Sequence, residues 1–332
     1  MNNIKMNNNN QNEYVNCDLC GSDSNTHITS QTDIIHKQTN EVFKVVRCNN
    51  CNLVFTNPRP KASEIEKYYP KKYYAHKKRF LNNKLLIRLK LILQSRFSLS
   101  LISLLPVVSK LFRLSVLPDL INPFLIKKDM LILDIGCGIG DNTHIWGPLN
   151  SIEQYKKITR NIYAVEPDLA ALNTLENNNF KAYSSIKNLP SDILFDVIRM
   201  NWSLEHTHSP NEYFNYLSQR LAKNGCAIIC VPNFNGDIYS TDPSMLELPV
   251  HLFHFTLETL TKYCKKQNLR IDSHYTFSYA SMYYFASKVS KNFSKYSNYS
   301  LKELINLQIK LDIENENKSA NGNDIVCVIR KN

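Results

Sequence analysis

The chain has 332 residues, of which 43% are hydrophobic, and this length and composition suit a globular protein of about two domains. Its first 13 residues are mostly asparagine without an apolar core, so we expect a disordered tail (1–13) rather than a secretory signal or an anchor. The chain is therefore expected to remain in the cytoplasm. Its nine cysteines then favour thiols and metal ligands over a disulfide framework.

The formal net charge of +11 comes from one stretch of the chain. The segment from Lys67 to Leu117 contains twelve Lys or Arg and no acid, which leaves 28 basic (40 − 12) against 29 acidic residues elsewhere. This pattern indicates a local anionic surface or substrate rather than a general affinity for nucleic acid. The uncharged run within it, Phe97 to Ser109, is too short to cross a membrane.

Within this stretch, Phe80 to Ser95 has the periodicity of a basic amphipathic helix. Two interpretations remain open. The helix covers the C-terminal domain with its charges in water, or residues 80–113 associate with an anionic surface at the inner face of the membrane.

Two Cys-x-x-Cys pairs stand near the N-terminus, Cys17/Cys20 and Cys48/Cys51, separated by 27 residues. Four thiolates on two tight turns form a closed tetrahedral site that zinc fills in structural roles. The sequence therefore predicts a small zinc-ribbon-like, zinc-binding module over residues 14–66. Four unligated thiols and a redox pair are the alternatives.

From residue 129 onward, short apolar strands alternate with helical segments, as in a doubly wound α/β sheet. We expect the zinc-binding module to be followed by a basic helical linker (67–128) and a C-terminal α/β domain (129–332). The predicted strands are Leu131 to Ile135, Asn161 to Val165, Lys181 to Tyr183, Phe195 to Met200, Cys226 to Val231, Leu269 to Phe277 and Asp324 to Arg330. Residues 146–160 are interpreted as an insertion, and 287–323 as a helix or mobile excursion.

The first of these strands leads into a glycine-rich turn that contains Gly136 and Gly138. Such a turn lets a ligand approach the backbone, but alone it equally suits NAD. Glu166, at the end of the next strand, can accept hydrogen bonds from both ribose hydroxyls of a nucleoside.

Together with Asp134, the Phe195 strand and Leu221 to Gly225, these motifs resemble class I S-adenosylmethionine-dependent methyltransferases, which have a Rossmann-like seven-stranded sheet. The resemblance implies S-adenosylmethionine as cofactor. It places Asp134, Gly136 and Gly138 at the methionine moiety, Glu166 at the ribose and Ser184 or Ser185 near the adenine. Asn201, at the end of the fourth strand, completes the expected cofactor-binding set.

The cysteine pairs, followed by the sequence Asn-Pro-Arg-Pro at 57–60 and by paired tyrosines, resemble a subgroup of sugar and polysaccharide methyltransferases. Glu205-His206 and the segment 249–256 are similar to further motifs of that subgroup. A tyrosine expected in its C-methylating members is Ser203 here, which favours O-methylation. Trp202 replaces the first Glu of a metal-binding Glu-x-x-Glu-His motif, so no catalytic metal is expected.

We therefore expect O-methylation of a sugar or glycan intermediate of surface polysaccharide biosynthesis, with a small-molecule, nucleotide-sugar or glycan acceptor. His206 is the candidate base, Glu205 its orienting neighbour and His251 its rival, and a structural role for the Glu-His pair is the alternative. RNA methylation and a non-catalytic scaffold are the competing functions. Without an Asn-Pro-Pro-Tyr-like motif, nucleic acid is not the expected partner.

Overall fold

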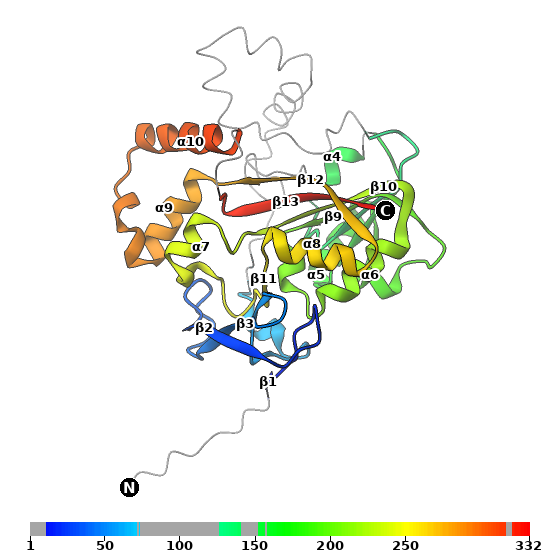
Figure 1. Ribbon diagram of the computed structural model, residues 1–332. Helices are drawn as coiled ribbons and strands as arrows, with labels where there is room; N and C mark the ends of the chain where they lie inside the picture. Colours follow the sequence, from blue (N-terminus) through cyan, green and yellow to red (C-terminus); the bar gives the residue numbers. More distant parts are fainter. Residues whose placement is uncertain (1–10, 72, 74–125, 141–151, 157, 317–320) are drawn as a thin grey trace.

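The computed structural model describes residues 11–71, 73, 126–140, 152–156, 158–316 and 321–332. The predicted helix over 80–95, the proposed membrane-contact segment 80–113 and most of the linker 67–128 lie outside these ranges, as does part of the predicted insertion. The described chain forms a central sheet with helices, above a smaller group of strands near the N-terminus (Figure 1).

The central sheet contains seven strands in the order β12-β13-β10-β9-β6-β7-β8. Neighbours from β10 to β8 are parallel, whereas β13 runs antiparallel to both β10 and β12. The strands are β6 (Ile132–Ile135), β7 (Ile162–Val165), β8 (Lys181–Tyr183), β9 (Phe195–Asn201), β10 (Leu221–Pro232), β12 (Leu269–Phe277) and β13 (Asp324–Lys331). The Rossmann-like fold and every predicted strand are confirmed, with β10 beginning earlier than expected.

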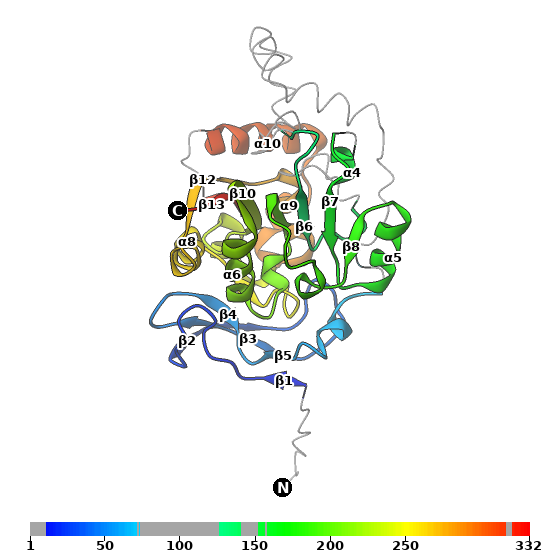
Figure 2. The ribbon, with the colours of Figure 1, turned by 90° about the vertical axis from the view of Figure 1, so that its right-hand side faces the viewer.

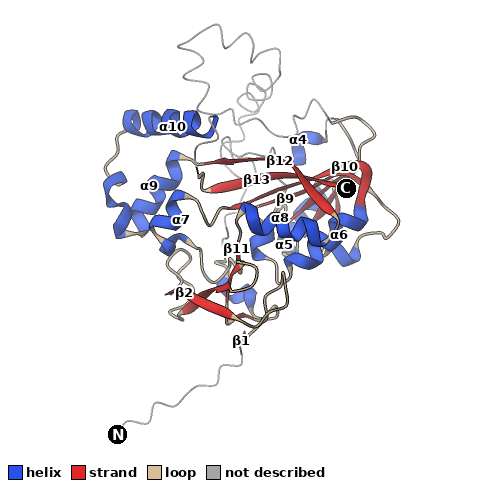
Figure 3. Cartoon of the chain, viewed as in Figure 1, coloured by secondary structure: helices blue, strands red, loops and turns tan. Residues whose placement is uncertain are grey.

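Helices lie on both sides of this sheet (Figure 3). The α-helices are α4 (Ile152–Tyr155), α5 (Leu169–Asn177), α6 (Pro210–Arg220), α7 (Asp237–Thr241), α8 (Leu257–Lys266), α9 (Ala280–Val289) and α10 (Leu301–Glu316). Short 3₁₀ helices are η1 (Ile65–Tyr68), η4 (Ile186–Asn188), η5 (Leu204–His206), η6 (Pro243–Met245) and η7 (Lys291–Tyr296). The excursion before the last strand is therefore helical.

The N-terminal strands form a second sheet below the first (Figure 2). Its order is β11-β4-β3-β2, with β2 (Asn25–Gln31), β3 (Phe43–Cys48), β4 (Val54–Thr56) and β11 (Phe253–His254), while β1 (Asn12–Glu13) pairs separately with β5 (Arg59–Pro60). Because β11 comes from the catalytic part of the chain, the two parts predicted from the sequence share a sheet.

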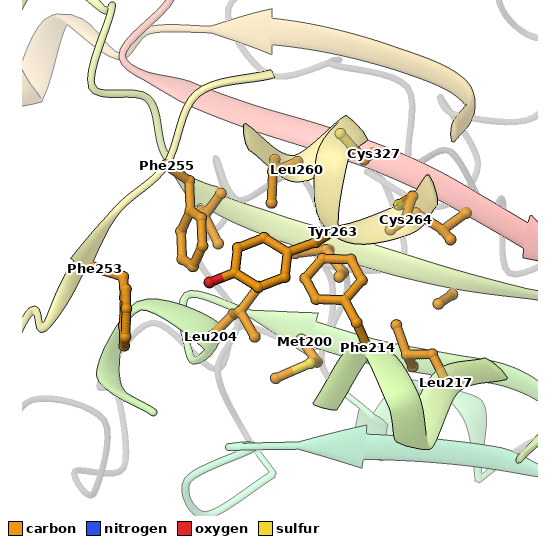
Figure 4. Close-up of a cluster of buried hydrophobic side chains, with 14 of the residues drawn as sticks. Met200, Leu204, Phe214, Leu217, Phe253, Phe255, Leu260, Tyr263, Cys264 and Cys327 are labelled. Carbon is orange, nitrogen blue, oxygen red and sulfur yellow. The ribbon is translucent and has the colours of Figure 1, made fainter. Parts of the chain in front are cut away.

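They also share a hydrophobic core. Buried side chains from the cysteine turns, the central sheet, α6 and α8 belong to one cluster. Within it the rings of Phe214 and Tyr263 stack at 5.0 Å, beside Phe253 and Phe255 (Figure 4). Each large side chain buried in this way contributes roughly 1.5–3 kcal/mol to folding. The N-terminal module is thus packed firmly on the layer that contains α6 and α8.

Among the helices that the structure describes, none combines the length and the apolar character that crossing a bilayer requires.

Candidate functional site

The glycine-rich turn after β6 adopts the backbone that its glycines were expected to allow. Gly136 and Gly138 have φ angles of +73° and +57°, in the left-handed region that favours glycine. The amide of Gly138 donates to Oε2 of Glu166 at 2.8 Å, and the amide of Asp168 donates to Oε1 at 3.1 Å. Glu166 therefore joins the turn after β6 to the end of β7, where the ribose was predicted.

Asp134 lies in β6 beside a buried arginine of β9. Its Oδ2 is 3.9 Å from Nη2 of Arg199, and both side chains are almost fully buried. Burial raises the pKa of Asp134, although the Arg199 charge opposes this shift. Its other oxygen, Oδ1, has no hydrogen-bond partner within the described residues, so it can still accept from a ligand's cationic group.

Ser184 and Asn201 reach the same edge of the sheet. Ser184 directly follows β8 and Asn201 ends β9, and parallel strands bring their carboxyl ends together. Oδ1 of Asn201 is a second buried acceptor that lacks a partner in the described part of the chain. The six predicted cofactor-binding residues therefore line the carboxyl edge of β6, β7, β8 and β9.

Gly136 also contacts the segment after β9. A Cβ atom at position 136 would lie 2.3 Å from Cβ of Ser203, so no larger residue fits without displacing that backbone. The hydroxyl of Ser203 donates to the Ile135 carbonyl at 2.8 Å. These contacts place η5, with Glu205 and His206, next to the cofactor turn.

The structure brings His206 and His251 together. Their ring centroids are 4.6 Å apart in an edge-to-face arrangement. Nδ1 of His206 lies 3.0 Å from the Val250 carbonyl and 3.0 Å from Oη of Tyr69. Since a carbonyl can only accept, we assign the proton to Nδ1, which leaves a lone pair on Nε2. Burial lowers the pKa of His206, so its neutral form predominates near pH 7.

Glu247 completes this cluster and was not singled out in the sequence. Its carboxylate accepts from Nε2 of His36 at 2.8 Å and lies 3.4 Å from Nε2 of His251. Burial alone would raise the pKa of Glu247, but His251 and His36 lower it to about 2. Burial also lowers the pKa of His251 to about 3. Glu247 is thus ionised between two imidazoles.

Glu205 is 1% exposed, and neither of its carboxylate oxygens has a hydrogen-bond partner among the described residues. Burial raises its pKa well above the usual range. Single ligand atoms from Glu205, His206 and His251 all lie within 4.8 Å of one another. The three predicted catalytic residues thus converge, and the same atoms could hold a divalent cation.

A separate cluster contains the four predicted zinc ligands. Sγ of Cys17 is 3.3 Å from that of Cys51, Sγ of Cys20 is 3.5 Å from that of Cys48, and all four lie within 4.8 Å of one another. These separations fit four thiolates around one zinc ion, for which Zn–S distances are about 2.3 Å.

The family follows from a comparison with known protein domains. Residues 109–274, which are half of the chain, match the family model described as "Methyltransferase domain". The chain belongs to this methyltransferase family. Its seven-stranded sheet, with the antiparallel β13 between β10 and β12, makes it a class I enzyme that uses S-adenosylmethionine. The expected enzyme class and cofactor are confirmed at this level.

No curated protein matches the chain. Several solved structures resemble this methyltransferase at low TM-scores. The YcgJ protein from Bacillus subtilis has a TM-score of 0.41 and 12% identity, covering 63% of this chain and 94% of that one. An S-adenosylmethionine-dependent methyltransferase from Clostridium acetobutylicum has a TM-score of 0.38 and 15% identity, and the match covers 63% of this chain and 86% of that one. The O-methyltransferase from a trans-AT PKS multienzyme of Brevibacillus brevis, in complex with S-adenosyl-L-homocysteine, has a TM-score of 0.37 and 16% identity, covering 67% and 71%.

Proposed function

We propose that this methyltransferase O-methylates a sugar or glycan intermediate of surface polysaccharide biosynthesis. The observation that carries this proposal is the position of His206, whose Nδ1 is held by the Val250 carbonyl in a cluster with Glu205 and His251 next to the cofactor turn. A hydroxyl attacks the sulfonium-bound methyl group in line and loses its proton as it does so. An imidazole that is neutral near pH 7 can accept that proton. The sugar class rests on the motifs shared with sugar methyltransferases.

In this proposal S-adenosylmethionine lies along the carboxyl edge of the sheet. Gly136 and Gly138 allow its methionine moiety to approach the backbone, Asp134 accepts from its ammonium group, and Glu166 accepts from the ribose hydroxyls. Ser184 lies toward the adenine, and Asn201 offers its buried carbonyl oxygen from β9. Glu205 is the neighbour that orients nearby groups, and the ionised Glu247 supports the positive charge that His206 acquires. His251 remains the alternative base.

We also propose that one structural zinc ion is bound by Cys17, Cys20, Cys48 and Cys51.

A cytoplasmic location and a peripheral contact of residues 80–113 with an anionic membrane are proposals from sequence alone. Flotation with anionic vesicles at low and high salt tests that contact.

The acceptor class is tested by incubating the enzyme with labelled S-adenosylmethionine and three pools: nucleotide sugars, oligosaccharides and ribosomal RNA. Mass spectrometry identifies the labelled product, and NMR identifies the methylated atom. A methyl ether on a sugar is the expected product. Label in RNA would support the competing RNA-methylation function, and a methyl group on nitrogen or carbon would contradict O-methylation.

A further inference from the structure

Asp18 lies in the first cysteine turn, between Cys17 and Cys20, and its carboxylate contacts the catalytic domain. Oδ1 accepts from the hydroxyl of Ser209 at 2.7 Å. Oδ2 accepts from the amide of Asn211 at 2.8 Å and from the hydroxyl of Tyr263 at 2.8 Å. Hydrogen bonds to an ionised acceptor are about twice as strong as neutral ones. One side chain of the module therefore binds both α6 and α8.

The Asp18 carboxylate caps the N-terminus of α6. The N-cap residue Ser209 makes no capping hydrogen bond with its own side chain, and Asn211 is the second residue of the helix. Asp18 supplies the missing acceptor from about 190 residues away, and its negative charge is favourable at a helix N-terminus. The start of α6 is thus fixed by the cysteine module.

The short connection between His206 and α6 is held by the same module. Nη1 of Arg59 donates to the His208 carbonyl at 2.7 Å, and the His208 ring donates to the Pro60 carbonyl at 3.1 Å. Together with Asp18, these contacts fix the backbone that directly follows η5. His206 cannot shift without disturbing them.

The loop that contains His251 is held in a similar way. The amide of Thr56 donates to the Leu252 carbonyl at 2.9 Å, and its hydroxyl donates to the His251 carbonyl at 3.2 Å. The amide of Leu252 in turn donates to the Glu205 carbonyl at 2.8 Å. The cofactor turn is joined to β7 through the Gly136 amide and the Glu166 carboxylate, and to the start of η5 through Ser203.

We propose that Asp18 is a positioning residue for methyl transfer, through which the cysteine module fixes the acceptor side of the site, with η5 and His206, independently of cofactor binding. This inference rests on the proposed function in that His206 takes the acceptor's proton. Because Cys17 and Cys20 flank Asp18, an ion bound by the four cysteines would help to set where this carboxylate lies. Loss of that ion would then disturb the same backbone as loss of Asp18.

The test compares Asp18→Asn with Asp23→Asn, since Asp23 is an exposed acid of the same turn region. Asparagine keeps the size of Asp18 but cannot accept all three hydrogen bonds. For Asp18→Asn we expect kcat to fall about tenfold, because small misplacements of reacting groups are costly, while the Kd for S-adenosylmethionine changes less than about twofold. Asp23→Asn should match the wild type in both quantities.

Hydrogen exchange provides a readout that needs no acceptor, so the inference can be tested even if the proposed acceptor class is wrong. Amides over residues 204–212 should exchange faster in Asp18→Asn, with those of the cofactor turn unchanged. If Asp18→Asn does not fold, Ser209→Ala and Tyr263→Phe each remove one of the three hydrogen bonds and should show smaller effects of the same kind. An unchanged kcat and exchange rate, or an equal loss of cofactor affinity, would overturn the inference.

Discussion

Oη of Tyr69 lies 3.0 Å from Nδ1 of His206, although 137 residues separate them in the chain. The start of the segment that follows the N-terminal module therefore contacts the candidate base directly. Tyr69→Phe keeps the ring and removes the hydroxyl, while the Val250 carbonyl still holds Nδ1. We expect kcat to fall by about threefold to tenfold, the effect of roughly 1 kcal/mol for one hydrogen bond.

In the same experiment the Kd for S-adenosylmethionine should not change, because Tyr69 lies on the acceptor side. Tyr14→Phe is the matched control, since Tyr14 is a tyrosine of the N-terminal part of the chain and is 81% exposed. A wild-type kcat for Tyr69→Phe would show that this contact does not position His206.

Cofactor affinity should depend on Glu166. Removing its carboxylate in Glu166→Ala eliminates the predicted ribose hydrogen bonds and the contact with the Gly138 amide, which should cost about 1–3 kcal/mol, or about 5-fold to 150-fold in Kd. Glu166→Gln retains one carbonyl acceptor and should lose less. Calorimetry measures both variants, and wild-type affinity in Glu166→Ala would rule out the ribose assignment.

The four cysteines should carry one zinc ion per chain. Metal analysis of Cys48→Ser combined with Cys51→Ser should show the loss of that ion and reduced stability of the N-terminal module, because binding energy of a structural metal is folding energy. Cys264→Ser, at a buried cysteine outside the cluster, is the control. Zinc that persists in the double variant would place the ion elsewhere.

Buried histidines should make the protein less stable in acid. Burial lowers the pKa of His254 from 6.5 to about 3, so between these values the unfolded chain binds a proton that the native protein does not. The contribution of His254 to stability is therefore complete above pH 6.5 and is lost as the pH falls toward 3. His251 has a similarly lowered pKa and adds to this loss.

His254→Gln removes one of these titrating groups and should lose less stability than the wild type between pH 7 and pH 5. Urea unfolding at both pH values measures the difference. Zinc release in acid affects both proteins alike, so it cancels in the comparison. Parallel losses in the two proteins would contradict this explanation.

The sequence allowed the central sheet and the cysteine cluster to be predicted because their signals are local. Apolar strands such as Phe195–Asn201 and the turn around Gly136 are each read from a few neighbouring residues. The ring of contacts around His206 was not predictable in this way. Tyr69 and Glu247 come from distant segments, and the pairing of β11 with β4 is one of the contacts that join the N-terminal strands to the part of the chain that contains His206. A lone glutamate at 247 gives no signal of its own.

His206 is proposed to remove the acceptor's proton beside a separately bound cofactor. The most direct test measures two quantities on His206→Ala: the single-turnover rate of methyl transfer to the identified acceptor, and the Kd for S-adenosylmethionine. We predict that the rate falls about 100-fold or more, as expected for the loss of a general base, while the Kd remains that of the wild type. A near-normal rate would remove His206 from the mechanism, and a lost affinity for S-adenosylmethionine would assign it a structural role.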